Sequence, residues 1–431
     1  MTQTADTSPA GAAIEPARGT PDEARWPDVF AVPKSGLRAA IAWAVFSRAV
    51  ARLPVLVRLP GGRHLGGGNG AAPEMVLHRP GDFCARVGAS GLIGFGESYM
   101  AGDWDCADLT GLITVFARQV AGLVPRPLQR LRRVSVRRQP AAERSTLARA
   151  RRNVSHHYDL SNELFALFLD ETMTYSAALF QTGDRGDLIA GPNSLAAAQR
   201  RKIDRLLDQT RVGPGTRVLE IGTGWGELAL RAAARGATVR TVTLSEQQRA
   251  LAIGRIAAAG LGDRVSVELR DYRDVHGQYD AILSVEMIEA VGERYWPAYF
   301  ETLDRLLAPG GRIGLQAITM AHDRMLATRD TYTWILKYIF PGGLIPSVTG
   351  IEAALARHTR LRVAGRLDFG PHYEQTLRLW RQRFTARRAD LPGLGFDEVF
   401  ARMWELYLSY SEAGFAASYL DVCQFLLERA R

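Results

Sequence analysis

The chain has 431 residues, more than one ordinary domain holds, so two or three domains are expected. Its hydrophobic content of 47% is ordinary for a globular protein with a full core, and its net charge of +9 favours an anionic partner: nucleic acid, membrane phosphate or an acidic substrate. Cys84, Cys106 and Cys423 are widely separated and match no metal-ligand spacing. We therefore expect no zinc site and no disulfides, and a reducing compartment.

The first 25 residues lack the apolar core that a signal peptide needs. Residues 1–25 are rich in Ala, Thr, Pro, Gly and Asp, which predicts a disordered tail. Residues 37–53 are apolar but carry three arginines, and they are too short to span a bilayer, which needs about 20 apolar residues. They predict an amphipathic helix. Packing in a core is the favoured interpretation, and lying on a membrane surface is the alternative.

An arginine-rich linker is predicted at residues 124–152, where ten arginines are interrupted by prolines. A solvated connector is the simplest interpretation. Nucleic-acid binding would call for interleaved aromatic side chains, which the segment lacks. Contact with anionic lipid headgroups is preferred, at about 1 kcal/mol per basic residue near the surface.

A glycine turn at residues 217–226, RVLEIGTGWG, organises the second half of the chain. A short buried strand, three alternate glycines and a helix at 227–235 form the nucleotide-binding corner of a doubly wound α/β sheet. The spacing is G-x-G-x-G rather than the dinucleotide pattern G-x-G-x-x-G. A helix is predicted before the turn at 196–208, and further strands at 238–245, 265–272, 279–285 and 310–319, giving a Rossmann-like fold.

The strand at 238–245 ends without the acidic residue that binds ribose hydroxyls in dehydrogenases. It ends in Thr243, Leu244 and Ser245, and Gln248 follows shortly. An amide can also hydrogen-bond a diol.

Several segments resemble the cyclopropane-fatty-acyl-phospholipid synthase family of S-adenosylmethionine-dependent methyltransferases. The matching motifs are G-E-S-Y-M-x-G-x-W at 96–104, H-Y-D-L-S-N at 157–162, M-T-Y-S-x-A-x-F at 173–180, T-L-S-x-x-Q at 243–248 and W-I-x-K-Y-I-F-P-x-G at 334–343. The resemblance runs from about residue 75 to the C-terminus. It implies a class I methyltransferase domain at 153–431 with acyl-binding helical insertions, and a smaller mixed α+β accessory domain for lipid binding at 26–123.

The resemblance also implies the ligand-contacting residues. The positions implied to contact S-adenosylmethionine are Tyr175, Ser176, Glu220, Gly222, Gly224, Thr243, Leu244, Gln248, Asp271 and Tyr272. A bicarbonate ion acts in the family's active site, and the positions implied to hold it include Glu289, Tyr373 and the backbone amide of Ile318. Glu286, near Glu289, is interpreted as a helix-start residue favoured by the helix dipole.

Two positions depart from the cyclopropane synthases. Ala177 stands where they have cysteine, and Gln316 stands where they have histidine at the end of the fifth strand. Glutamine can donate a hydrogen bond but cannot act as a base. The bicarbonate site is therefore altered, and cyclopropane formation is not the favoured outcome.

Within the family, V-E-M-I-E-A-V-G, Q-A-I-T and F-A-R-M-W-E-L-Y-L are most similar to the actinobacterial branch that makes 10-methylene fatty acyl phospholipids, precursors of tuberculostearate. We expect methylene transfer to the cis double bond of an oleoyl phospholipid at the inner membrane surface, by a cytoplasmic, peripheral enzyme. A homo-oligomer and a separate reductase acting on the product are compatible partners; nucleic acid is not expected. The alternatives are a cyclopropane synthase and a non-catalytic lipid-binding protein.

The aromatic-rich stretch 403–425 is interpreted as helical core, with an acyl tunnel as the alternative.

Overall fold

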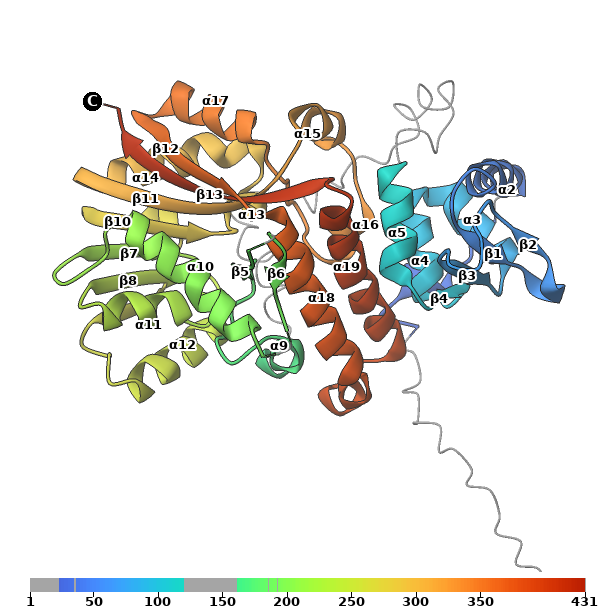
Figure 1. The fold of residues 1–431 in the computed structure, drawn as a ribbon, viewed down its shortest axis with the longest axis horizontal. Coiled ribbons are helices and arrows are strands. Elements are labelled where there is room, and N and C mark those ends of the chain that lie inside the picture. The colour runs from blue at the N-terminus through green and yellow to red at the C-terminus, as the bar shows by residue number, and fades with distance from the viewer. Residues whose placement is uncertain (1–22, 35, 120–160, 185, 192, 431) are drawn as a thin grey trace, which may run out of the picture.

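The computed structural model describes residues 23–34, 36–119, 161–184, 186–191 and 193–430 (Figure 1). The arginine-rich linker, most of the predicted tail and the first part of the H-Y-D-L-S-N motif lie outside these residues. Residues 23–25, which the sequence assigned to the tail, form a turn. The guanidinium of Arg25 lies 5.4 Å from the ring centroid of Trp26.

A seven-stranded sheet forms the larger part of the molecule, as the predicted doubly wound α/β fold requires. Its strand order is β12-β13-β11-β10-β7-β8-β9. The strands are β7 (Arg217–Ile221), β8 (Thr238–Thr243), β9 (Val265–Leu269), β10 (Tyr279–Val285), β11 (Leu307–Met320), β12 (Leu361–Asp368) and β13 (Leu420–Arg429). The five predicted strands are present and mutually parallel, and β13 joins them antiparallel between β11 and β12.

The order of the strands reverses between β7 and β10. The chain passes from β7 outward to β8 and β9, and then crosses back to β10 on the other side of β7. In open α/β sheets, the crevice at the carboxyl ends of the strands beside such a reversal is where ligands bind. The topology therefore locates a ligand site at the ends of β7 and β10.

Helices cover both faces of this sheet because its central strands are apolar on both sides. In β7, Leu219 and Ile221 face one core, whereas Val218 faces the other. The first core is completed by α14 (Trp296–Leu306) and α17 (Val348–His358). The second is completed by α10 (Leu195–Gln209), α11 (Glu227–Ala234) and α12 (Glu246–Ala258).

A smaller N-terminal unit contains a four-stranded sheet of order β2-β1-β3-β4. Its elements are α1 (Pro27–Phe30), α2 (Gly36–Val50), β1 (Leu56–Arg58), β2 (His64–Leu65), β3 (Glu74–Leu77), α3 (Pro80–Ser90), α4 (Leu92–Met100), β4 (Trp104–Cys106) and α5 (Leu109–Arg118). The predicted amphipathic helix is α2, which packs against α3 while leaving Leu37 and Ile41 exposed. Within the described residues, no helix is long and apolar enough to cross a membrane.

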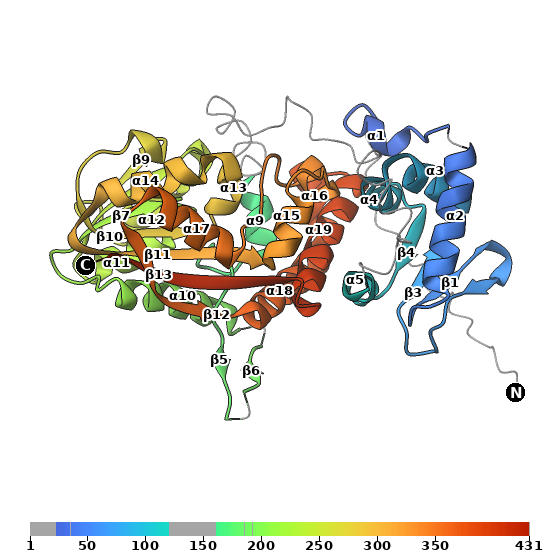
Figure 2. The same cartoon turned by 90° about the horizontal axis from the view of Figure 1, so that it is seen from above.

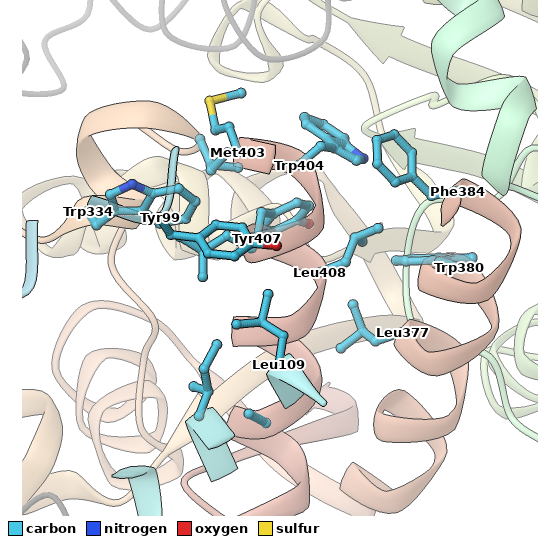
Figure 3. Close-up of a cluster of buried hydrophobic side chains, with 14 of the residues drawn as sticks. Tyr99, Leu109, Trp334, Leu377, Trp380, Phe384, Met403, Trp404, Tyr407 and Leu408 are labelled. Carbon is cyan, nitrogen blue, oxygen red and sulfur yellow. The ribbon is translucent and has the colours of Figure 1, made fainter. Parts of the chain in front are cut away.

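The two units meet at α18 (Gly370–Ala386) and α19 (Glu398–Ala416), an antiparallel pair between the large sheet and the N-terminal unit (Figures 1 and 2). The remaining short elements are α9 (Asn162–Phe168), β5 (Gln181–Thr182), β6 (Leu188–Ile189), α13 (Ile288–Val291), α15 (His322–Thr328) and α16 (Trp334–Tyr338). One apolar cluster joins both units, and Figure 3 shows Tyr99 of α4 and Trp404 of α19 within it.

The aromatic stretch 403–425 is only partly helical, which corrects the prediction. Helix α19 ends at Ala416, and Phe425 lies on β13. Trp404 and Tyr407 are buried in the cluster, whereas Tyr410 is 41% exposed. The helical part is thus packed core, in line with the favoured interpretation.

Two of the family motifs contact each other across the boundary between the units. Glu97 of α4 accepts hydrogen bonds from Lys337 Nζ at 2.5 Å and from the Tyr338 hydroxyl at 2.9 Å. The indole of Trp334 lies against Gly96, where an added Cβ would come within 2.3 Å of the ring. Glycine is therefore required at position 96 by the close approach of α16.

We expect Gly96→Ala to lower the free energy of unfolding by about 1–3 kcal/mol, because the methyl group would force the Trp334 indole out of its packing. The matched control is Gly81→Ala on α3, where an added Cβ meets nothing within 4 Å. Urea unfolding followed by tryptophan fluorescence measures both. Equal midpoints for the two variants would contradict the close contact.

Candidate active site

The glycine turn follows β7 and opens α11. Gly222, Gly224 and Gly226 have φ values of 94°, 51° and 90°, in the left-handed region that residues with a Cβ rarely adopt. An added Cβ at Gly222 would lie 2.8 Å from the Met287 side chain, whereas at Gly224 it would meet nothing within 4 Å. The backbone at Gly224 thus borders open space.

That space is a cavity at the carboxyl ends of the parallel strands, as the strand reversal predicts. Its lining includes all of the residues that the sequence implied for the cofactor: Tyr175, Ser176, Glu220, Gly222, Gly224, Thr243, Leu244, Gln248, Asp271 and Tyr272. The lining also includes Lys202, Arg273 and Met287, which the sequence had not singled out. Segments separated by up to about a hundred residues therefore converge on one site.

The end of β8 is organised by side-chain hydrogen bonds. Thr243 Oγ1 donates to Gln248 Oε1 at 2.9 Å. Ser245 caps α12 by accepting from the Gln248 backbone amide at 3.2 Å. Because Oε1 is engaged, the Nε2 group of Gln248 is the part of the amide left to donate to a ligand, which suits a hydroxyl acceptor.

The end of β9 presents an acid and an aromatic ring. Asp271 caps the short 3₁₀ helix that follows β9 and is paired with the guanidinium of Arg273. Tyr272 packs edge-on against Tyr299, with ring centroids 5.5 Å apart. Burial raises the pKa of Tyr272 to about 12, and its hydroxyl has no partner among the described residues.

A buried acid and a buried base face the cavity from β7 and α10. Glu220 Oε2 has no hydrogen-bond partner among the described residues, and burial raises the pKa of Glu220 to about 8. Lys202 Nζ donates to Ser176 Oγ at 2.6 Å, and burial lowers the pKa of Lys202 to about 8. An unpartnered buried carboxylate oxygen on a cavity wall is suited to receive a cationic group of a ligand.

Glu286, directly after β10, accepts hydrogen bonds from three separate segments. The donors are the Ala177 backbone amide at 3.0 Å, Gln316 Nε2 at 2.7 Å and the Tyr373 hydroxyl at 2.8 Å. Burial raises the pKa of Glu286, and these hydrogen bonds together with the charge of Lys202 oppose the rise. The interpretation of Glu286 as a helix-start residue is wrong, because its carboxylate is engaged by tertiary contacts.

Glu289, on α13, contacts a different group. Its Oε1 accepts a short hydrogen bond from the Ile318 backbone amide, and its Oε2 has no partner among the described residues. Burial, reinforced by the charge of Glu286, raises the pKa of Glu289 to about 8. Glu289 and Tyr373, which the resemblance assigned to one ion, are therefore not bonded to each other, and Glu286 takes the hydrogen bond from Tyr373 instead.

The orientation of Gln316 is fixed by a chain of amides. Gln424 Nε2, on the neighbouring strand β13, donates to Gln316 Oε1 at 3.0 Å, and Arg205 donates to Gln424 Oε1 at 2.6 Å. Because a guanidinium can only donate, this order of bonds turns Gln316 Nε2 toward Glu286. The donors expected to bind bicarbonate are thus taken by protein carboxylates, and the expected ion does not fit at these atoms.

Tyr175 connects the cavity to the aromatic cluster. Its hydroxyl lies 2.6 Å from the Tyr407 hydroxyl, and its ring centroid lies 5.2 Å from that of Trp380 and 5.1 Å from that of Phe165. The wall on this side of the site is therefore aromatic rather than polar.

A metal-like grouping lies on β12 and β13. Ligand atoms of Asp368, Asp421 and Cys423 are within 4.8 Å of one another. The Cys423 thiol donates to Asp368 at 2.8 Å, and burial raises its pKa, so the thiolate that a metal would require is disfavoured. Asp421 is already bonded to the backbone amides of Gly370 and Val422.

The chain is similar in sequence to known S-adenosylmethionine-dependent enzymes that act on lipids. The model of the mycolic acid cyclopropane synthetase family matches residues 145–425. The tuberculostearic acid methyltransferase UfaA1 of Mycobacterium tuberculosis is 56% identical over 415 residues, 95% of this chain and 96% of that protein. The cyclopropane-fatty-acyl-phospholipid synthase of Escherichia coli is 34% identical over 365 residues, 84% of this chain and 89% of that protein.

Solved structures with the same fold include two cyclopropane synthases. MmaA2 from Mycobacterium tuberculosis superposes with a TM-score of 0.57 at 30% identity, covering 64% of this chain and 97% of that one. CmaA1, complexed with SAH and CTAB, superposes with a TM-score of 0.58 at 29% identity, covering 68% of this chain and 99% of that one.

We expect the affinity for S-adenosylmethionine to rise with pH and to level off above about 8. The cationic ligand favours ionised Glu220, whose pKa of about 8 without ligand means that a proton must leave at lower pH. Titration calorimetry between about pH 6 and 9, in buffers of different ionisation enthalpy, measures the affinity and the protons released.

The variant Glu220→Gln removes the titrating group, so it should bind more weakly and lose most of the pH dependence. The matched control is Glu246→Gln on the exposed start of α12, which should behave as the unmodified protein. An unchanged pH slope in Glu220→Gln would show that another group releases the proton.

Proposed function

The chain belongs to the mycolic acid cyclopropane synthetase family, and from that membership we propose that it transfers a one-carbon unit from S-adenosylmethionine to the cis double bond of an unsaturated acyl chain in a phospholipid. The resemblance read from the motifs is confirmed, as are the methyltransferase class and the α/β fold. The observation that carries the proposal is the 56% identity to a tuberculostearic acid methyltransferase over 95% of the chain.

The proposed product is a methylene-branched chain, 10-methylene-stearoyl from oleoyl. Support comes from the higher identity to the tuberculostearic acid methyltransferase than to the Escherichia coli cyclopropane synthase, 56% against 34%. Ala177 and Gln316 add to it, because both differ from the residues of cyclopropane synthases and both contact Glu286. Cyclopropane formation is the second candidate, since the family includes enzymes of that activity.

The cavity residues fit S-adenosylmethionine. The unpartnered Glu220 Oε2 can accept a hydrogen bond from the amino group of S-adenosylmethionine. The Gln248 amide can donate to the ribose hydroxyls of the same ligand. The open backbone at Gly224 leaves room for the ligand, and Tyr272 offers an aromatic face for adenine. When bound, this cofactor supplies an electrophilic methyl group that adds to the alkene and leaves a carbocation on the acyl chain.

The protein must then protect that cation from water. Tyr373 packs against Phe415, with ring centroids 4.6 Å apart, and meets Trp380 edge-on at 6.2 Å. Together with the Tyr175–Tyr407 contact, these rings form a dry wall beside Glu286. Exclusion of water prevents hydrolysis of reactive intermediates, and positioning supplies most of the rate.

We further propose that the enzyme works as a peripheral protein at the cytoplasmic membrane surface. The net charge of +9 and the arginines of residues 124–152 suit anionic headgroups. On α2, exposed Leu37 and Ile41 flank Arg38, which suits contact with lipid at that end of the N-terminal unit. A homo-oligomer and a separate reductase acting on the methylene product are compatible with this assignment.

We expect cells that express this chain and are fed oleate to accumulate methylene-branched C19 chains, because the cation can rearrange by a hydride shift to the more substituted carbon before a proton is lost. Gas chromatography of fatty acid methyl esters measures the product. Gly224→Val is the control without product, since valine is strained at a φ of 51° and enters the cavity. A dominant cyclopropane peak without methylene product would overturn the product assignment alone.

We expect binding to anionic vesicles to weaken with salt and with loss of the linker arginines. Exposed charges are screened within about 8 Å at physiological ionic strength. The variant with Arg130, Arg132, Arg133, Arg137 and Arg138 changed to Gln should sediment with vesicles at lower salt only. Unaltered binding would show that the linker is merely a connector.

A further inference from the structure

Glu286 combines a strained backbone with a fully engaged carboxylate. Its φ of 51° lies in the left-handed region, which among the described non-glycine residues is shared only by Met173, Arg211 and Ser418. Residues with a Cβ adopt this conformation at a cost in conformational free energy, and such strain concentrates at functional sites. The conformation directs the side chain from the end of β10 into the site rather than along α13.

The three donors to Glu286 come from three independent elements. Ala177 lies in the segment before β5, Gln316 on β11 and Tyr373 on α18. Burial, with the Glu286 carboxylate as the largest charged neighbour, raises the pKa of Tyr373 well above its usual range, so the hydroxyl remains a donor. Hydrogen-bond donors positioned in this way stabilise an anion. Here they bind the carboxyl group of Glu286, a side chain of the protein, rather than a separate ion.

Lys202 and Glu289 determine which acid carries the charge. Glu286 has three hydrogen-bond donors and the attraction of Lys202, whereas Glu289 has one donor and an unpartnered oxygen. Two neighbouring buried carboxyl groups do not both ionise readily, and the better-solvated one ionises first. These contacts therefore stabilise the ionised form of Glu286 more than that of Glu289.

Glu286 also reaches the place where chemistry would occur. It lines the cavity together with Tyr175 and Ser176, beside the aromatic wall. Its Oε1 accepts two of the three hydrogen bonds and its Oε2 only one, so Oε2 retains a free lone pair.

We propose that the carboxylate of Glu286 is the base of the reaction and stands in place of a bicarbonate ion. This rests on the proposed function. After the hydride shift, the new methyl group carries an acidic C–H bond beside the cationic carbon. Glu286 Oε2 takes that proton, the C–H electron pair becomes the π bond of the exocyclic methylene, and the positive charge is cancelled. Glu286 becomes a neutral acid and returns its proton to solvent after product release.

The test compares Glu286→Gln with Glu286→Gly. The amide has the same shape but is not a base, so turnover should fall about 10²- to 10⁴-fold while the affinity for S-adenosylmethionine is kept. Glycine adopts the observed φ without strain and empties the space of the carboxylate. Glu286→Gly should therefore be slow in carbonate-free buffer and regain turnover when bicarbonate is added, whereas Glu286→Gln should not.

The unmodified protein and the control Glu301→Gln, on the side of α14 that is open to solvent, should turn over equally with and without bicarbonate. Turnover is measured as transfer of labelled methyl groups to oleoyl phospholipid vesicles. A second readout is line broadening of ¹³C-bicarbonate in NMR, expected with Glu286→Gly and absent with the unmodified protein. Calorimetry with S-adenosylmethionine checks that each variant is folded.

The proposal is overturned if the unmodified protein loses activity without bicarbonate, if it broadens the bicarbonate signal, or if Glu286→Gln turns over at the normal rate. If Glu286→Gly does not fold, the unmodified protein and Glu286→Gln decide the question by the same criteria. An unmodified protein that methylates no unsaturated phospholipid would refute the proposed function first, and the base assignment with it. If only the base assignment fails, the unmodified protein still methylates unsaturated phospholipid when bicarbonate is present.

Discussion

The buried carboxyl group of Glu286, at the carboxyl end of β10, is the constraint on which the centre of this molecule depends. A carboxylate can be kept in a dry site only when donors replace the water it has lost. Here the donors are supplied by the segment before β5, by β11 and by α18, so this carboxyl group fixes how three distant parts of the chain meet. Gln424 and Arg205 extend the arrangement, since they orient the amide of Gln316 from β13 and α10.

The N-terminal unit is physically continuous with this centre. Glu97 of α4 holds Lys337 and Tyr338, and the chain after them returns to the site, where the Leu344 amide donates to the Glu289 carbonyl at 2.8 Å. One short segment therefore contacts both the N-terminal unit and the backbone of Glu289. The packing of the N-terminal unit is therefore linked to the position of Glu289 through a few residues rather than through the whole sheet.

The sequence predicted the parallel strands well, because their signals are local, and the residues that it assigned to the cofactor lie together on one cavity. Apolar runs and alternate glycines define β7, and motifs tied to strand ends place Thr243 and Gln248 on the same cavity. Strands β12 and β13 were missed because they pair antiparallel at an edge, where an aromatic helix precedes β13 directly. Glu286 was misread for a different reason: its neighbours in sequence fit a helix start, whereas its partners lie 109, 30 and 87 residues away. The one local hint was an acidic residue directly after a parallel strand.

The electrostatics of the cavity also favour the order of events in the reaction. The cavity lining includes two buried carboxyl groups, Glu220 on β7 and Glu286 after β10, together with the buried amine of Lys202. Negative charge fixed in advance stabilises positive charge wherever it develops nearby, without rearrangement at the moment of reaction. Bound S-adenosylmethionine would carry the positive charge before methyl transfer, and the acyl chain would carry it afterwards. With Glu286 as the proposed base, its carboxylate would stabilise the cation on the acyl chain, and that attraction would end only when the proton has left the chain. Glu286 would then both stabilise the cation and remove the proton that neutralises it. The position of this one side chain would therefore govern the lifetime of the cation and the product that forms.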